Sequence, residues 1–262
     1  MNSKIYQNVD NTLALLNIQD QLNKHLCGED YLKTKICAKS GRKIVYARAA
    51  WLECAELTES MEYKWWKGTK NDIENMKLEC VDIYHFMLSM FLEYINDYAK
   101  LDNNREVPEK EKRRIIEEIV RNVKIEKITT VSDDHFTDSV LMLTESLASS
   151  FINYIYSDYK EKKYLLIEIY EKWTSLASFL YTEADFTKLY ISKSILNKFR
   201  SDMNYNEDYN KLWYNGQEDN VALKEIMDEL LENDPKLINN VGEFSKQVYS
   251  NLKLLFDQSH NS

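Results

Sequence analysis

Four acidic residues occur as two pairs with the spacing of one helical turn. Glu53 and Glu56 form the first pair, and Glu79 and Asp82 form the second, each inside an otherwise apolar run. Residues three positions apart lie on one face of an α-helix, so each pair points in one direction. Carboxylates turned toward a shared interior stay ionised only beside a cation, and Mg²⁺ prefers such oxygen ligands. The spacing therefore predicts facing helices of a bundle that pool four Mg²⁺ ligands.

The alternative for each pair is an ordinary solvated helix face. Such acidic patterns are frequent in a chain of which 29% is charged. Here, however, both pairs border apolar positions such as Leu52 and Leu78, and a surface face would alternate acids with Lys or Arg. On spacing alone the metal site and the solvated face both stay open.

An aromatic and basic segment follows the first pair, and a histidine follows the second. Lys64, Trp66 and Lys67 interleave a ring with cations, which can stack on a base and contact phosphate. The alternative is a packed helix end whose Trp rings close the core. His85 continues the series of the second pair, although a lone His is more often an ordinary polar residue than a ligand.

A second polar stripe lies far along the chain. Lys193, Asn197 and Arg200 follow at i, i+4 and i+7, so two cations and an amide share one helix face. The alternative is a surface stripe. The most loop-like stretch of the chain follows it, at residues 205–216.

The composition favours helices. Gly (5) and Pro (2) are scarce among 262 residues, whereas a β-rich fold needs many turns. We expect one all-α catalytic domain over residues 1–262, a helical bundle with a more variable helical segment at 100–182. Periodicity predicts helices over residues 3–26, 43–63, 72–98, 108–127, 133–157, 160–181, 183–202 and 219–232, and one after Pro235.

Charge and cysteine content restrict the partners. A net charge of −9 argues against sustained binding to duplex nucleic acid. The four cysteines show no CxxC spacing, which favours reduced thiols and a cytoplasmic protein. We expect no membrane association, because the N-terminus lacks a signal-peptide core and no run of about 18 apolar residues occurs.

Four blocks, taken together and in this order, resemble the dimeric all-α dUTP diphosphatase (dUTPase) family of the all-α NTP pyrophosphatase superfamily. They are residues 19–23, 53–67, 79–86 and 196–220. No single block is specific, but the combination is, and residues 100–182 carry no recognisable signature. One departure is the segment 203–208, which is shorter than the family pattern by one residue and lacks its Lys and both glycines.

The resemblance implies a role for each matching position. The Mg²⁺ ligands would be Glu53, Glu56, Glu79 and Asp82. The deoxyuridine pocket would be shaped by Gln19, Asn23, Trp66 and His85, with Lys64 and Lys67 as further substrate contacts. The phosphates would be held by Lys193, Asn197, Arg200, Tyr205, Lys211 and Asn220. For the base that takes the proton of the attacking water we choose Glu56, followed closely by Glu53.

The expected activity is Mg²⁺-dependent hydrolysis of dUTP, and also of dUDP, to dUMP, which keeps uracil out of DNA. The resemblance further implies a homodimer. One alternative is a MazG-like all-α pyrophosphatase that acts on other nucleoside triphosphates. Another is a non-catalytic helical interaction protein, in which the acidic pairs are solvated faces.

Overall fold

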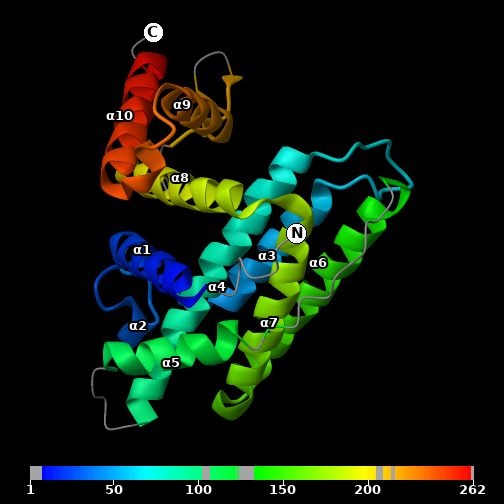
Figure 1. Ribbon diagram of the computed structural model, residues 1–262, viewed down its shortest axis with the longest axis vertical. Helices are drawn as coiled ribbons and strands as arrows, with labels where there is room; N and C mark the ends of the chain where they lie inside the picture. The colour runs from blue at the N-terminus through cyan, green and yellow to red at the C-terminus, as the bar shows by residue number, and fades with distance from the viewer. Residues whose placement is uncertain are drawn as a thin grey trace. The chain divides into compact units, whose positions relative to one another are not determined.

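The computed structural model describes residues 8–101, 107–121, 123, 133–204, 209–213 and 216–260, and within these ranges it confirms the predicted all-α fold (Figure 1). The helices are α1 (Val9–Cys27), α2 (Tyr31–Thr34), α3 (Tyr46–Glu59), α4 (Ile73–Leu101), α5 (Glu109–Val120), α6 (Asp133–Tyr156), α7 (Tyr159–Leu180), α8 (Glu183–Asp202), α9 (Asp219–Asn233) and α10 (Val241–His260), with a 3₁₀ helix η2 (Leu237–Asn239). Among these described helices, none is long and apolar enough to cross a membrane.

The chain divides into two compact units, residues 1–183 (unit 1) and 184–262 (unit 2). Unit 1 holds α1 to α7, and unit 2 holds α9, α10 and all of α8 after its first residue. Both acidic pairs therefore belong to unit 1, and the polar stripe of α8 belongs to unit 2. The single catalytic domain over 1–262 stays a prediction about how the two units work together.

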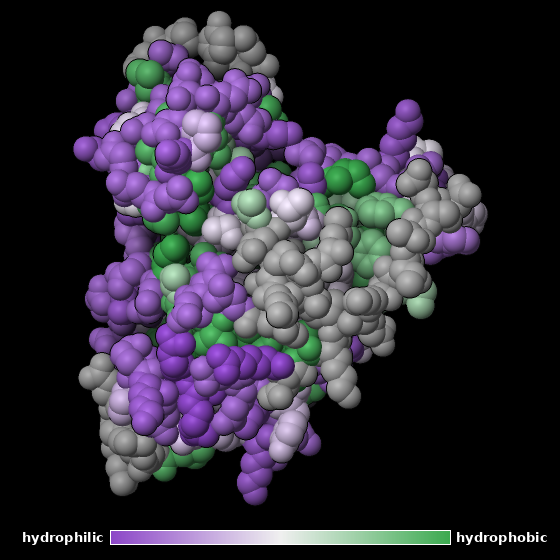
Figure 2. Space-filling view, viewed as in Figure 1, coloured by the Kyte–Doolittle hydropathy of each residue, from purple (hydrophilic) through white to green (hydrophobic). Residues whose placement is uncertain are grey.

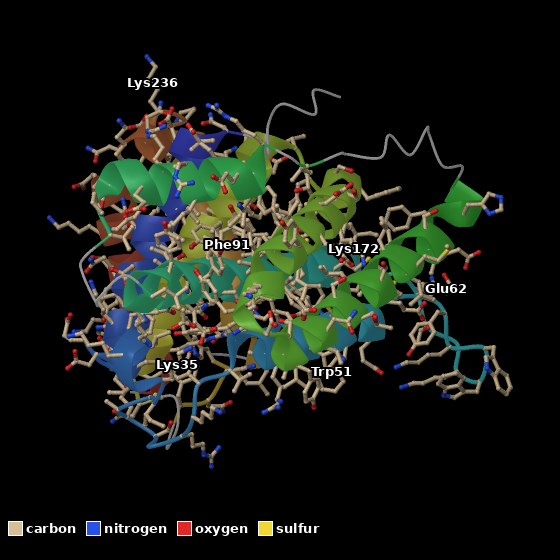
Figure 3. All side chains as sticks on the ribbon, turned by 90° about the horizontal axis from the view of Figure 1, so that it is seen from below. Lys35, Trp51, Glu62, Phe91, Lys172 and Lys236 are labelled. Carbon is tan, nitrogen blue, oxygen red and sulfur yellow. The ribbon has the colours of Figure 1, made fainter. Side chains whose placement is uncertain are left out.

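The long helix α4 is the centre of unit 1. It packs against α1, α3 and α7, and its fully buried residues include Ile83 and Phe91; Figure 3 shows Phe91 among the helices. Trp173 of α7 packs on Tyr84 with ring centroids 4.3 Å apart, and its indole N–H donates to the carbonyl of Cys80 at 3.1 Å. A buried indole keeps its apolar contacts only if its N–H finds such an acceptor.

The segment 100–182 supplies much of the packing of unit 1. In it, α6 packs on α3, α7 packs on α4, and α5 packs on α1 and α7. The charged helix α5 buries Ile115, Ile116 and Ile119. Hydrophilic residues gather over this helix on the surface (Figure 2). The charged stretch is therefore one face of an amphipathic helix, and the segment supports the two helices that carry the acidic pairs.

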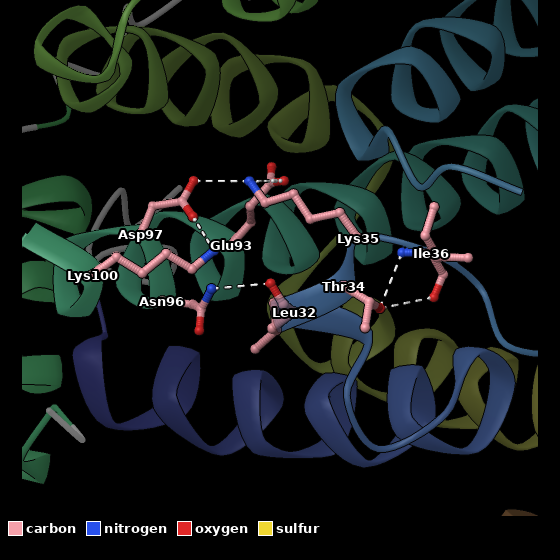
Figure 4. Close-up of polar contacts among 8 residues, drawn as sticks. All are labelled: Leu32, Thr34, Lys35, Ile36, Glu93, Asn96, Asp97 and Lys100. Carbon is pink, nitrogen blue, oxygen red and sulfur yellow. Dashed lines mark hydrogen bonds and ion pairs between the residues drawn. The ribbon is translucent and has the colours of Figure 1, made fainter. Parts of the chain in front are cut away.

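The short helix α2 links α1 to α4 and lies between the helices predicted over residues 3–26 and 43–63. Tyr31 is buried, and its hydroxyl donates to Asp20 of α1 at 2.8 Å. Lys35 pairs with Glu93 at 2.9 Å and with Asp97 at 3.0 Å, both on α4 (Figure 4). The helical turn places the buried Tyr31 ring against α1 and the Lys35 ammonium against α4. These contacts hold α1 beside α4.

Helix α3 ends at Glu59, several residues before the predicted end. The backbone N–H of Asp72 donates to the carbonyl of Ser60 at 2.9 Å, and the backbone N–H of Glu62 donates to the Asn71 side chain at 2.8 Å. These bonds close the connection between α3 and α4 at its base.

Trp173→Ala should lower the free energy of unfolding by about 3–5 kcal/mol, because it removes a fully buried ring and its hydrogen bond. Urea denaturation measures this change. The matched control is Tyr164→Ala on the same helix, where the side chain is 73% exposed and the expected change is within about 0.5 kcal/mol. Equal effects of the two substitutions would contradict the central place of Trp173.

Candidate active site

The packing of α3 against α4 brings the acidic pairs together. One carboxylate oxygen each of Glu53, Glu56 and Glu79 lie within 4.8 Å of one another. Glu53 and Glu79 are half-buried and Glu56 is exposed. The two helices thus pool their acids, as the spacing predicts.

The acidic group lies at the edge of the core and not inside it. Leu52, which we expected to border the interior, is 49% exposed. The reason is the register of α3, which buries Cys54 and Leu57 in the core. Glu53 and Glu56 immediately precede these buried residues, so they lie at the rim of the packed surface and remain accessible to ligands.

Burial raises the pKa of Glu53 to about 9, with the charges of Asp82, Glu56 and Glu79 as further causes. Asp82 lies one helical turn after Glu79, and its charge is the largest of the three electrostatic causes. It therefore belongs to the electrostatic surroundings of Glu53. In the absence of a cation, Glu53 keeps its proton at neutral pH because ionisation would add a charge to an already negative group.

The donor set fits a hard divalent cation. Three carboxylates from two helices offer oxygen atoms, which Mg²⁺ prefers, and they leave positions for water and phosphate. A bound cation would stabilise the ionised form of Glu53 against both burial and the neighbouring charges, so binding should release a proton. The sequence expectation of a metal site and the geometry of the three carboxylates agree.

Three residues predicted for the deoxyuridine pocket meet in unit 1 between α1 and α4. The Nδ1 atom of His85 lies 2.7 Å from Oε1 of Gln19, and Nε2 of Gln19 donates to Oδ1 of Asn23 at 2.9 Å. Nδ2 of Asn23 then donates to Oγ of Ser89 at 2.9 Å. All four side chains are buried. They form one continuous polar chain inside an otherwise apolar contact.

The aromatic and basic turn between α3 and α4 is exposed. Trp65 is 91% exposed and Trp66 61%, so the alternative of rings that close the core is wrong. Trp66 contacts the rings of Tyr63 and Trp65 at centroid distances of 6.1 and 5.6 Å. Lys64 pairs with Glu59, and Lys67 is exposed. Trp65, Trp66 and Lys67 are thus presented to solvent, whereas the Lys64 side chain is only 11% exposed.

In unit 2, the cations of the predicted stripe lie in a buried cluster, so the alternative of a surface stripe is wrong for them. Lys193 is 3% exposed and Arg200 8%. The guanidinium of Arg200 donates two hydrogen bonds to the fully buried carboxylate of Asp219, at 2.8 and 2.7 Å. The amide oxygen of Asn220 accepts from Lys193 at 3.1 Å. A buried guanidinium and a buried ammonium group therefore lie beside Asp219 and Asn220, and both are groups that can bind phosphate.

The remaining predicted phosphate contacts are less enclosed. Asn197 is half-buried and Lys211 is exposed. The carbonyl of Lys211 accepts from the backbone N–H of Asp219 at 2.9 Å, which holds its segment at the start of α9. Tyr205 lies outside the described residues, as does most of the shortened segment 203–208.

Two residues outside the predicted set complete these arrangements. Ser89 follows His85 by four positions, and a helical Ser hydroxyl at this spacing bonds the carbonyl one turn earlier, so its place was predictable. Asp219 lies 19 residues from its partner Arg200. No local pattern indicates that pairing, because it depends on how α8 and α9 pack.

The pKa of Glu53 gives a prediction for the metal-free protein. Its carboxyl has a pKa of about 9 in the folded chain against 4.5 ordinarily, so between these values the folded state binds more proton. This contribution to stability is complete below about pH 4.5 and is lost as the pH rises through about 9. Glu53→Gln should therefore flatten the decline in unfolding free energy toward alkaline pH. Urea denaturation in chelator measures it, with Glu74→Gln as the control; parallel pH profiles for wild type and Glu53→Gln would contradict the prediction.

A family model described as dUTPase matches residues 11–205 of this chain. The matched span contains both acidic pairs, the buried polar chain and the polar stripe of α8, and it also covers the segment 100–182. No curated protein matches the chain. Because the family model covers more than half of the 262 residues, the chain belongs to the dUTPase family and is a dUTP diphosphatase.

Proposed function

We propose that this dUTPase requires Mg²⁺ and hydrolyses both dUTP and dUDP to dUMP, with pyrophosphate as the second product of dUTP. The observation that carries the proposal is the group of three carboxylates within 4.8 Å, inside the span that matches the family. A MazG-like enzyme for other nucleoside triphosphates also uses paired acids, and the family match favours dUTP over that alternative.

Glu53, Glu56, Glu79 and Asp82 would hold the cation. When bound, Mg²⁺ neutralises charge on the phosphate oxygens and lowers the pKa of bound water. The carboxylates of α3 and α4 orient the reacting groups, because they come from two helices fixed by the core beneath them. They also concentrate negative charge where a nucleotide could not otherwise bind, which makes the reaction depend on the cation.

Glu56 is our choice for the base that accepts the proton of the attacking water. It is exposed, whereas Glu53 and Glu79 are half-buried, so its carboxylate has access to solvent. Glu53 is the second choice, because it belongs to the same carboxylate group and can accept a proton once a cation has ionised it.

Substrate binding would use both units. Gln19, Asn23 and His85 would bind the base, with Trp66, Lys64 and Lys67 as contacts from the exposed turn. The phosphates would be bound by Lys193, Asn197, Arg200, Tyr205, Lys211 and Asn220. Support for the second set is the burial of Lys193 and Arg200 and the hydrogen bond from Lys193 to Asn220.

We further propose a cytoplasmic homodimer that does not bind duplex nucleic acid. The family resemblance implies the dimer, and the net charge of −9 disfavours a polyanionic partner. The four cysteines are free thiols, which favours a reducing compartment. Large exposed apolar side chains, such as Leu52 at 49% and Met142 at 70%, offer apolar surface for a second copy.

Glu56→Gln should lower kcat for dUTP by about a hundredfold or more, because the base is lost while the side-chain volume is kept. The assay compares dUTP, dUDP, dTTP, dCTP and UTP with Mg²⁺ and in chelator. Glu74→Gln is the matched control, since it makes the same change on α4 at a residue paired with Lys77 outside the acidic group. Turnover of Glu56→Gln near that of the control, or full activity in chelator, would reject the proposal.

Light scattering at micromolar concentration should report about twice the chain mass of 31.1 kDa. The physical reason is that a pair of subunits would cover the exposed apolar side chains of α3 and α6. A mass equal to one chain would contradict the dimer.

A further inference from the structure

The polar chain between α1 and α4 is isolated from water. Gln19, Asn23 and His85 are 3–4% exposed, and Ser89 is fully buried. A buried polar group left without a partner costs about 1–3 kcal/mol. The amides therefore cannot turn over independently, because reversing one of them would place two donors or two acceptors face to face. The hydrogen-bond direction at one end of the chain determines the direction at the other.

Ser89 sets that direction. Its hydroxyl donates to the backbone carbonyl of His85 at 2.9 Å, which uses its single proton. Toward Asn23 its oxygen can then only accept, and Nδ2 of Asn23 is the donor at 2.9 Å. Asn23 consequently turns its oxygen to Gln19, whose Nε2 donates to it at 2.9 Å. Gln19 in turn presents its oxygen to His85.

The last link fixes the histidine tautomer. Nδ1 of His85 lies 2.7 Å from Oε1 of Gln19, and a carbonyl oxygen can only accept, so Nδ1 carries the proton. In the neutral ring Nε2 is then an acceptor. With the opposite chain direction, Gln19 would present its NH₂ group, and the acceptor and donor of the imidazole would exchange places.

This polarity matters for the choice of base. Uracil presents a donor at N3 and an acceptor at O4, whereas cytosine presents an acceptor at N3 and a donor at N4. A pocket that discriminates them needs groups of fixed polarity, since an amide or imidazole free to reverse would suit either base. We propose that Ser89 is a positioning residue that fixes the hydrogen-bond polarity of the deoxyuridine pocket, and through it the preference for uracil over cytosine. The inference rests on the proposed function of this site.

The direct test is Ser89→Ala, which leaves Nδ2 of Asn23 without its acceptor and releases the chain to reverse. The ratio of kcat/KM for dUTP to that for dCTP should fall by about tenfold or more. The loss should appear in KM for dUTP, with kcat nearly unchanged, because base contacts bind ground state and transition state alike. Ser89→Thr keeps the hydroxyl and should restore the ratio. An unchanged ratio in Ser89→Ala would overturn the proposal.

Ser175→Ala is the control for the loss of a buried helical hydroxyl. Ser175 is 5% exposed and donates to the carbonyl of Glu171, four residues earlier, at 3.0 Å. It matches Ser89 in burial and in this bond. If Ser89 acted only through stability, the two variants would change the ratio equally, and that result would also overturn the proposal.

A second measurement needs no turnover. Nitrogen-15 chemical shifts of the imidazole report which ring nitrogen carries the proton, and His85→Asn assigns the signal among the four histidines. The expected result for the neutral ring in the wild type is a proton on Nδ1. A proton on Nε2 would overturn the polarity assignment. If the protein hydrolysed no deoxynucleotide, the proposed function would fail, and this measurement would still decide the direction of the chain.

Discussion

The packing of α3 against α4 is the contact on which the rest of the structure depends, because it holds like charges together. Two ionised carboxylates within 4.8 Å of each other repel by about 3 kcal/mol or more at an effective dielectric constant of about 20. A domain is stable by only about 5–15 kcal/mol in total. The repulsion is tolerable because Cys54, Leu57 and Val81 are buried beneath the acids and Glu53 can hold a proton. A bound cation would reduce the repulsion among the carboxylates further, so the same group of like charges favours cation binding.

The segment 100–182 helps to hold α3 and α4 together, although it contains no predicted site residue. Helix α6 packs on α3 and α7 packs on α4, so this segment supports both helices that carry the acidic pairs. Trp173 connects α7 to α4 through ring packing and a hydrogen bond. A segment that contains no predicted site residue can thus be necessary for activity, because it resists the separation of α3 and α4.

The sequence predicted the helices and the acidic group well, because both depend on local periodicity. Glu53, Glu56 and Glu79 meet because i, i+3 pairs on adjacent helices face each other once the helices pack. The sequence could not predict how far the carboxylates are buried, because the neighbouring Leu52 is apolar and yet exposed. The pairing of Arg200 with Asp219 was likewise unpredictable, because it depends on tertiary packing within unit 2.

Helix α4 also fixes the spacing of four polar residues along its length. Glu79, Asp82, His85 and Ser89 follow at steps of three, three and four residues, which keeps them on one side of a continuous helix about 15 Å apart from first to last. Each added or deleted residue would rotate everything after it by about 100°. Substitutions in this stretch can be compensated locally, whereas a single-residue insertion or deletion between Glu79 and His85 would turn these two residues to different sides of the helix. Length variation in this protein is therefore expected in the connections and not within α4.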